Sequence, residues 1–124
     1  MTFTAEGHLT YLTDAVLITA VVGAGRADLL LSAMREVGAS GGLVHHARGT
    51  GVRERFGLLG VAIEADKEVL TVVAAVEHQE LLVRTLYRAG ELHVPGAGYL
   101  YVTPLDRVAT HVPEEALDRL GARR

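Results

Sequence analysis

The residues from Val16 to Val22 form a continuous run of mostly β-branched side chains, all of them apolar except for one threonine. Such a run is typical of a strand that is buried on both faces, or nearly so. Gly23-Ala-Gly25 ends the run, and apolar residues then recur at helical spacing from Arg26 as far as Gly38, a natural C-terminal stop. The sequence therefore predicts a buried strand that leads directly into a helix.

The rest of the chain alternates between apolar segments and glycine- or proline-containing breaks. The first half of this part predicts a strand at Leu43–Arg48, an exposed loop at Gly49–Arg55 and an apolar segment of ambiguous type at Phe56–Ile63. A strand at Glu68–Ala75 and a helix through Leu81–Ala89, closed by Gly90, are predicted next. A loop at Glu91–Gly98 then leads to a strand at Tyr99–Thr103, which Pro104 ends. Pro113 is a favoured first helical residue, and the glutamates that follow it predict a short tail helix.

The predicted order is β-α-β-β-α-β, which is the ferredoxin-like order. We therefore expect an α+β fold, a ferredoxin-like β-α-β-β-α-β sandwich with a short C-terminal helix. The 124 residues fit a single domain over 1–124, with a core at about 15–112 and the tail helix at 113–124. Two helices over four strands leave one sheet face bare. Because 49% of the residues are apolar, we expect copies of the chain to cover that face in an oligomer.

Composition excludes several classes of function. The net charge is −3 and no basic run is present, which argues against a nucleic-acid partner. The absence of cysteine excludes disulfide scaffolds, thiol nucleophiles and cysteine-based metal sites. The longest apolar run, Ala15–Gly25, is shorter than the about 20 residues that span a bilayer, and no charged segment precedes it as in a signal peptide. We expect a cytoplasmic protein that does not insert into membranes.

Two glycine-rich segments stand out, Arg48-Gly-Thr-Gly-Val-Arg53 and Pro95-Gly-Ala-Gly-Tyr99. Alternating glycines allow a backbone to approach an anion closely and to turn N–H groups toward it. Taken singly, such segments are more often ordinary turns, and neither matches a Walker loop or a dinucleotide fingerprint. Lys67 is the single lysine among twelve basic residues, so an anion site here would use guanidinium, backbone N–H or hydroxyl groups.

Together with the order of elements, these segments give the chain a resemblance to the PII signal-transduction proteins. It resembles the divergent PII-like branch of the nitrogen regulatory protein P-II superfamily, from about Val16 to His111. The residues that carry the resemblance are Met34–Gly42, Arg48–Gly51, Lys67–Val73, Gly96–Val102 and Pro104–Arg107.

The resemblance implies a homotrimer that binds a small-molecule effector in the clefts between subunits. An adenine nucleotide is the effector that it favours. A mobile loop after the second strand of the fold, here at about 51–66, would contact a regulated partner, which is a membrane transporter or a metabolic enzyme. Such a protein is a regulator in signal transduction and not an enzyme.

The resemblance also places the ligand-binding residues. Gly49, Thr50 and Gly51 would form the base of the mobile loop, with Arg53 as a phosphate contact. A second, phosphate-contacting loop would comprise Gly96, Ala97, Gly98 and Tyr99. Ser40 and Val73 would line the nucleotide base.

The sequence departs from the family pattern where charge is needed. Tyr99 stands where the family has a lysine, and the paired C-terminal arginines would fall near Thr110 and Val112, with Arg107 and His111 close by. Each missing charge-assisted contact costs about 1.5–3 kcal/mol, which disfavours the usual tight ATP binding. ADP, AMP, ATP, cyclic AMP and no nucleotide at all remain open. The segment at 51–66 contains no tyrosine that could be nucleotidylated.

Two other groups of polar residues, one of histidines and one of carboxylates, give weaker indications of function. His45 and His46 are adjacent on a predicted strand, so their side chains point to opposite faces and cannot chelate one metal ion together. Their ordinary interpretation is as solvated or core residues, although one histidine from each of three subunits could meet at a trimer axis. Glu64, Asp66 and Glu68 are typical of a solvated start of a strand.

The residues give no support for an enzymatic function. The chain has two serines, no cysteine and no asparagine, and no histidine stands at a motif spacing from a nucleophile. We therefore predict neither catalytic nor metal-binding residues. The alternative function is a trimeric ferredoxin-like metal-binding or structural module that resembles the divalent-cation tolerance proteins.

Overall fold

The computed structural model describes residues 2–6, 9–50 and 64–111. Along the chain it has β1 (Thr2–Glu6), β2 (Leu9–Thr13), β3 (Ala15–Gly23), α1 (Ala27–Glu36), β4 (Leu43–Thr50), β5 (Glu64–Ala75), the 3-10 turn η2 (Val76–His78), α3 (Gln79–Ala89), β6 (Gly98–Leu105) and β7 (Val108–Thr110). The segment at 51–63 and the predicted tail helix at 113–124 lie outside the described residues.

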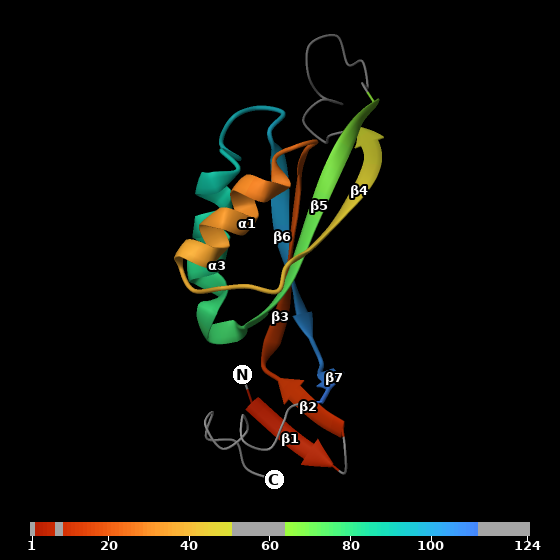
Figure 1. Ribbon diagram of the computed structural model, residues 1–124, viewed down its shortest axis with the longest axis vertical. Coiled ribbons are helices and arrows are strands. Elements are labelled where there is room, and N and C mark those ends of the chain that lie inside the picture. Colours follow the sequence, from red (N-terminus) through yellow and green to blue (C-terminus); the bar gives the residue numbers. More distant parts are fainter. Residues whose placement is uncertain (1, 7–8, 51–63, 112–124) are drawn as a thin grey trace.

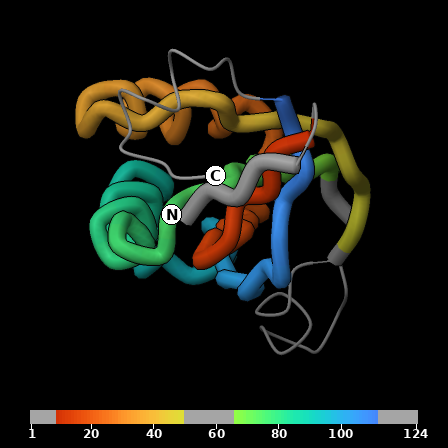
Figure 2. Tube along the Cα trace, turned by 90° about the horizontal axis from the view of Figure 1, so that it is seen from below, coloured from red at the N-terminus to blue at the C-terminus, as the bar shows by residue number. Residues whose placement is uncertain are grey.

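The main sheet has four antiparallel strands in the order β4-β5-β3-β6. Helices α1 and α3 lie side by side on one of its faces (Figures 1 and 2). From β3 to β6 the elements follow the predicted β-α-β-β-α-β order, which confirms the ferredoxin-like fold. β3 and β5 are the central strands, in agreement with their continuous apolar sequences.

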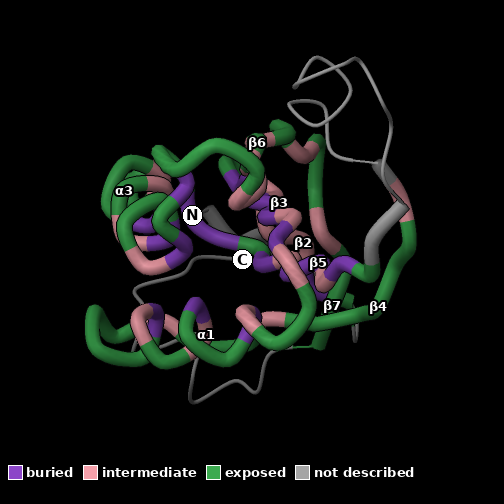
Figure 3. Tube along the Cα trace, turned by 90° about the horizontal axis from the view of Figure 1, so that it is seen from above, coloured by how far each residue is buried: buried purple, intermediate pink, exposed green. Residues whose placement is uncertain are grey.

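The core lies between the helices and the sheet, where the buried residues gather (Figure 3). Every second residue of β3 faces the helices, from Val16 to Val22, and the side chains of Leu30, Met34 and Leu86 close over them. Leu30 and Leu86 are completely buried, which accounts for the helical spacing of apolar residues seen in both helices.

Helix α1 ends as its sequence predicts. Gly38 has a φ of +85°, the amide of Gly38 donates to the carbonyl of Arg35, and that of Ala39 donates to the carbonyl of Met34. This pair of bonds is a Schellman motif with glycine in its left-handed position. α3 ends with the same two bonds, from Glu91 to Arg88 and from Leu92 to Tyr87.

Two expectations about strand ends are wrong. Gly49 and Thr50 belong to β4 and not to a loop, because they pair with Ala65 and Glu64, so β5 begins four residues before Glu68. β6 continues through Pro104, which pairs with Val16. Proline lacks an N–H, but β6 is an edge strand and one of its sides has no neighbour to bond in the described chain.

The sequence analysis did not find the second sheet. It has three strands in the order β1-β2-β7 and lies beyond the end of β3 and β6 (Figure 1). The guanidinium of Arg107 lies 4.5 Å from the ring centroid of Tyr11 and so joins the β6–β7 connection to β2. Asp14, with a φ of +56°, separates β2 from β3.

Candidate functional site

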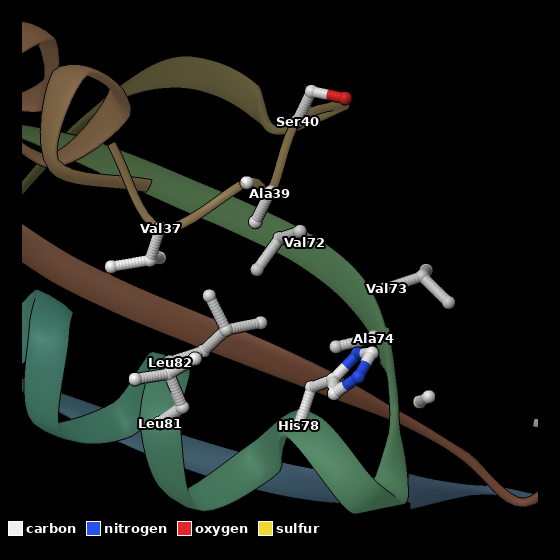
Figure 4. A pocket seen from close by; sticks show the side chains of 11 residues that line it. Val37, Ala39, Ser40, Val72, Val73, Ala74, His78, Leu81 and Leu82 are labelled. Atoms are coloured by element: carbon white, nitrogen blue, oxygen red, sulfur yellow. The ribbon is translucent and has the colours of Figure 1, made fainter. Parts of the chain in front are cut away.

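A pocket of about 350 Å³ opens where α1, β5 and η2 meet (Figure 4). It is lined by Val37, Gly38, Ala39, Ser40, Val72, Val73, Ala74, Ala75, His78, Leu81 and Leu82. None of these residues carries a fixed charge, and the pocket volume falls in the range of small-molecule sites. The pocket is thus suited to an uncharged group of a ligand.

The strand lengths leave one wall of the pocket unpaired. β4 begins at Leu43, opposite Thr71, whereas β5 continues to Ala75. No described strand therefore pairs with Val72–Ala75 on the β4 side of β5. Because backbone groups alternate between the two sides of a strand, the N–H and C=O groups on this side remain available to a ligand.

Two of the residues assigned by resemblance, Ser40 and Val73, line this pocket together. Ser40 lies in the α1–β4 connection with its hydroxyl at the rim, and Val73 lies on the open end of β5 (Figure 4). The sequence analysis missed His78, whose imidazole extends from η2 toward Ala74. No motif marks His78, since only the fold brings the end of β5 to the α1–β4 connection.

The glycine-rich residues lie at the other end of the main sheet. Gly49 and Thr50 end β4. Gly51 and Arg53 belong to the segment 51–63 and lie outside the described residues. The α3–β6 connection reaches the same end of the sheet (Figure 1). It contains Gly96, with a φ of +81°, and Ala97, whose amide donates to the carbonyl of Val94 at 3.0 Å.

Gly98 is required by the backbone. Its φ is +135°, and a Cβ built on it would lie 2.1 Å from the carbonyl oxygen of Val21. Only glycine fits this position, which begins β6. The next residue, Tyr99, is exposed and its ring stacks with that of Tyr101, with centroids 6.4 Å apart.

Within one chain, the pocket residues Ser40 and Val73 lie far from the glycine-rich residues. Val22 pairs with Gly98 on one side and with Glu68 of β5 on the other. Glu68 is five residues before Val73, so Gly98 and Val73 are separated by about 17 Å along the strand direction. Gly49 is level with Ala65, eight residues before Val73, or about 26 Å. β4 and β6 are also opposite edges of the sheet. The pocket and the two glycine-rich segments are therefore separate within one subunit.

Glu68 is not a solvated carboxylate at the start of a strand. Its side chain is 13% exposed, and its Oε1 accepts a hydrogen bond from the backbone N–H of Ala27 at 3.1 Å. The bond to Ala27, the first residue of α1, is the main reason why the pKa of Glu68 lies below its ordinary value, and burial acts in the opposite direction. Glu68 thus caps α1, whose N-cap residue Arg26 makes no side-chain cap bond.

The charged residues near the loop base are paired on the surface. The Nε of Arg48 lies 3.4 Å from Asp66, and both side chains are 70% exposed. The Nε2 of His46 lies 4.0 Å from Glu68 on the helix side of the sheet. Exposed ion pairs of this kind contribute little to stability.

Comparison with known proteins finds similarity among solved structures. No family model and no curated protein matches the chain. Among solved structures, the crystal structure of Arabidopsis thaliana PII bound to citrate is similar, with a TM-score of 0.59 and 20% sequence identity. The match covers 76% of this chain and 79% of the plant protein.

The chain has the fold of a PII protein. The similarity extends over 76% of the chain although only 20% of the aligned residues are identical, so what the two proteins share is the fold. The four-stranded sheet and its two helices have the order of elements that the sequence predicts.

The PII-like sheet separates the two adjacent histidines. His45 pairs with Val69 on the bare face, and His46 pairs with Glu68 on the helix side, as predicted from the strand alternation. Within residues 2–6, 9–50 and 64–111, no group of three or more metal-binding side chains is present. In the same ranges no helix is long and apolar enough to cross a membrane.

Proposed function

We propose that this protein is a cytoplasmic PII-like regulator that binds an adenine nucleotide in the clefts between the subunits of a homotrimer. Nucleotide binding changes the state of the loop at 51–66, of which 64–66 extend β5. The loop in turn controls a membrane transporter or a metabolic enzyme. The observation that carries this proposal is a PII-like fold with a small-molecule pocket at the open end of β5.

The bare face of the main sheet supports assembly into an oligomer. Cross-strand partners point to the same face, so Leu43, Thr71, Thr19 and Tyr101 form one row across the sheet, on the side away from the helices. Leu43 is 72% exposed and Tyr101 is 49% exposed. The two exposed apolar side chains lie at the two edges of this uncovered face, where a neighbouring subunit could cover them. Three copies of the chain cover these faces in the proposed trimer.

The separation of the candidate residues supports a site between subunits. Ser40 and Val73 lie at one end of the sheet, whereas Gly49 and Gly98 lie about 17 Å or more away at the other. Within a single chain, a nucleotide with its base in the pocket would have to extend along five or more residues of β5 to reach the glycine-rich end. Two neighbouring subunits, one contributing the pocket and the other the glycine-rich end, can enclose it.

The chemistry of the pocket supports a purine base as the buried part of the ligand. Val72, Leu81 and Leu82 give the pocket apolar walls, and the polar groups are the hydroxyl of Ser40, the imidazole of His78 and the free edge of β5. A flat heterocycle with donors and acceptors along one edge matches a strand edge and an apolar wall. The phosphates would then extend out of the pocket toward a neighbouring subunit.

Regulation through the loop follows from its position. β4 and β5 form the long antiparallel pair that carries residues 51–63, and the register from Leu43 to Thr50 is continuous. A ligand that contacts the end of β4 favours one state of the loop only if its affinity differs between the states. Ordering of a segment by ligand contacts is a known switching mode.

The test is calorimetric titration of the full chain with ATP, ADP, AMP and cyclic AMP, with and without magnesium. Citrate joins the panel because the plant PII structure contains it. Binding of an adenine nucleotide near one per subunit, in a particle with three times the mass of the chain, is the expected result. If a folded protein binds no nucleotide, or is monomeric throughout, the proposal is wrong.

A further inference from the structure

The β3–α1 turn contains an arginine with an unsatisfied atom. Arg26 follows Gly25, and its guanidinium Nη2 lies 3.3 Å from the Oε2 of Glu91. Its Nε is buried and has no hydrogen-bond partner within the described part of the chain. Buried polar groups are nearly always bonded, so an orphaned donor on a charged side chain indicates a missing acceptor.

The position of Arg26 links this donor to the glycine-rich end of the sheet. The side-chain Cδ of Arg26 lies 3.9 Å from the position that a Cβ on Gly23 would take. Gly23 follows Val22, and Val22 pairs with Gly98. Glu91 begins the α3–β6 connection that leads to Gly96. Arg26 and Glu91 therefore lie on the two connections that adjoin the segment assigned by the resemblance to phosphate contact.

Glu91 holds Arg26 from an unusual backbone position. Glu91 has a φ of +51° in the left-handed place of the Schellman motif that ends α3, where glycine is normally found. Gly90 is adjacent but occupies the preceding helical position, with a φ of −83°. A non-glycine residue there stores backbone strain, and such strain is often found at functional positions. The pair is open to solvent, with side-chain exposures of 34% for Arg26 and 60% for Glu91.

We propose that Arg26 neutralises the phosphate group of the bound effector, with Glu91 as the carboxylate that holds the guanidinium when no ligand is present. This inference rests on the proposed function and supplies the positive charge that is missing at Tyr99. Guanidinium binds phosphate with two parallel N–H bonds. The side chain of Arg26 is 34% exposed although its Nε is buried, so we assign the two Nη atoms as the pair of donors to phosphate. An incoming phosphate competes with Glu91 for the guanidinium.

The experiment compares ADP with adenosine, which has the same base and ribose but no phosphate. Affinities are measured by calorimetry for the wild type, Arg26→Gln, Glu91→Gln and a control, Arg88→Gln. Arg88 is an exposed arginine in the last turn of α3 with no assigned role. We expect Arg26→Gln to weaken ADP binding at least about tenfold, with adenosine binding and the Arg88→Gln variant unchanged. Glu91→Gln should strengthen ADP binding severalfold, because the competing carboxylate is removed.

The outcomes separate this inference from the proposed function. If the wild type binds ADP and Arg26→Gln binds it equally well, Arg26 has no phosphate role and the proposed function stands. Equal losses for ADP and adenosine in Arg26→Gln overturn the inference as well, since a phosphate contact cannot weaken adenosine. If Arg26→Gln does not fold, Glu91→Gln decides: unchanged or weaker ADP binding overturns the inference. If the wild type binds neither ligand, the proposed function fails and the inference fails with it.

Discussion

The carboxylate of Glu68 on β5 accepts a hydrogen bond from the backbone N–H of Ala27, the first residue of α1. The two residues are 41 positions apart in the sequence. A strand side chain thus supplies the cap that Arg26, the N-cap residue, does not provide. It also ties α1 to the strand that leads from the loop at 51–63.

This bond predicts a dependence of stability on pH. The pKa of Glu68 is lower in the folded protein than in the unfolded chain, mainly because the carboxylate accepts the Ala27 N–H. Its stabilising contribution is therefore complete above the ordinary glutamate pKa of about 4.3 and is lost as the pH falls through the lower folded value. Thermal unfolding of Glu68→Gln should show a lower midpoint than wild type at pH 7. The difference should shrink in acid, and a constant difference would contradict this account.

Gly98→Ala should destabilise the fold by at least about 2 kcal/mol, because the new Cβ meets the carbonyl oxygen of Val21 at a positive φ. Gly49→Ala is the matched control, since nothing lies within 4 Å of a Cβ at that strand position. Urea unfolding of both variants measures the difference. Equal midpoints for the two variants would show that the start of β6 can relax away from Val21.

Leu30→Ala should cost about 2–5 kcal/mol, because Leu30 is completely buried between α1 and the sheet. The adjacent Leu29 is 53% exposed, so Leu29→Ala should change the free energy of unfolding by less than about 0.5 kcal/mol. Chemical denaturation of the pair tests the orientation of α1. A larger loss for Leu29→Ala would mean that assembly buries the outer side of the helix.

Two exposed tyrosines allow a test of the proposed interface. Tyr101 is 49% exposed on the bare sheet face, and Tyr87 is 44% exposed on α3. Tyr101→Asp should dissociate the proposed trimer, because it places a charge in an apolar contact, whereas Tyr87→Asp should leave it intact. Analytical ultracentrifugation gives the mass of each. Dissociation by Tyr87→Asp alone would place the interface on the helix side.

Periodicity predicted the PII-like core because the core depends on local patterns. The run from Val16 to Val22 and the helical spacing around Leu30 and Leu86 each report burial within one element. The second sheet was missed because its local pair, β1 with β2, shows no strong apolar pattern, and its other pairing joins Thr10 to Thr110, far apart in the chain. Gly49 was placed in a loop because glycine often ends a strand, but its pairing with Ala65 decides the matter.

The candidate site was less predictable than the fold. The resemblance selected Ser40 and Val73, and the structure places them in one pocket. His78 and Arg26 belong to no sequence motif. The structure alone shows that His78 lines the pocket and that the Nε of Arg26 is buried without a hydrogen-bond partner in the described part of the chain. In the sequence Glu68 groups with its charged neighbours, whereas the fold brings it to the backbone N–H of Ala27. Properties that depend on contacts between distant segments have no signature in a single sequence.

The pocket exists because β5 is four residues longer than the part of it that β4 covers. The difference in length is set by the connection from Val37 to Gly42, where Gly42 packs so tightly that a Cβ would lie 2.8 Å from the side chain of Leu70. A point substitution along the pocket wall alters its lining, whereas an insertion that extended β4 would remove the pocket altogether. The proposed ligand binding would therefore be encoded as much in the spacing between elements as in the identity of side chains. Insertions and deletions at this connection are the changes by which binding could be gained or lost.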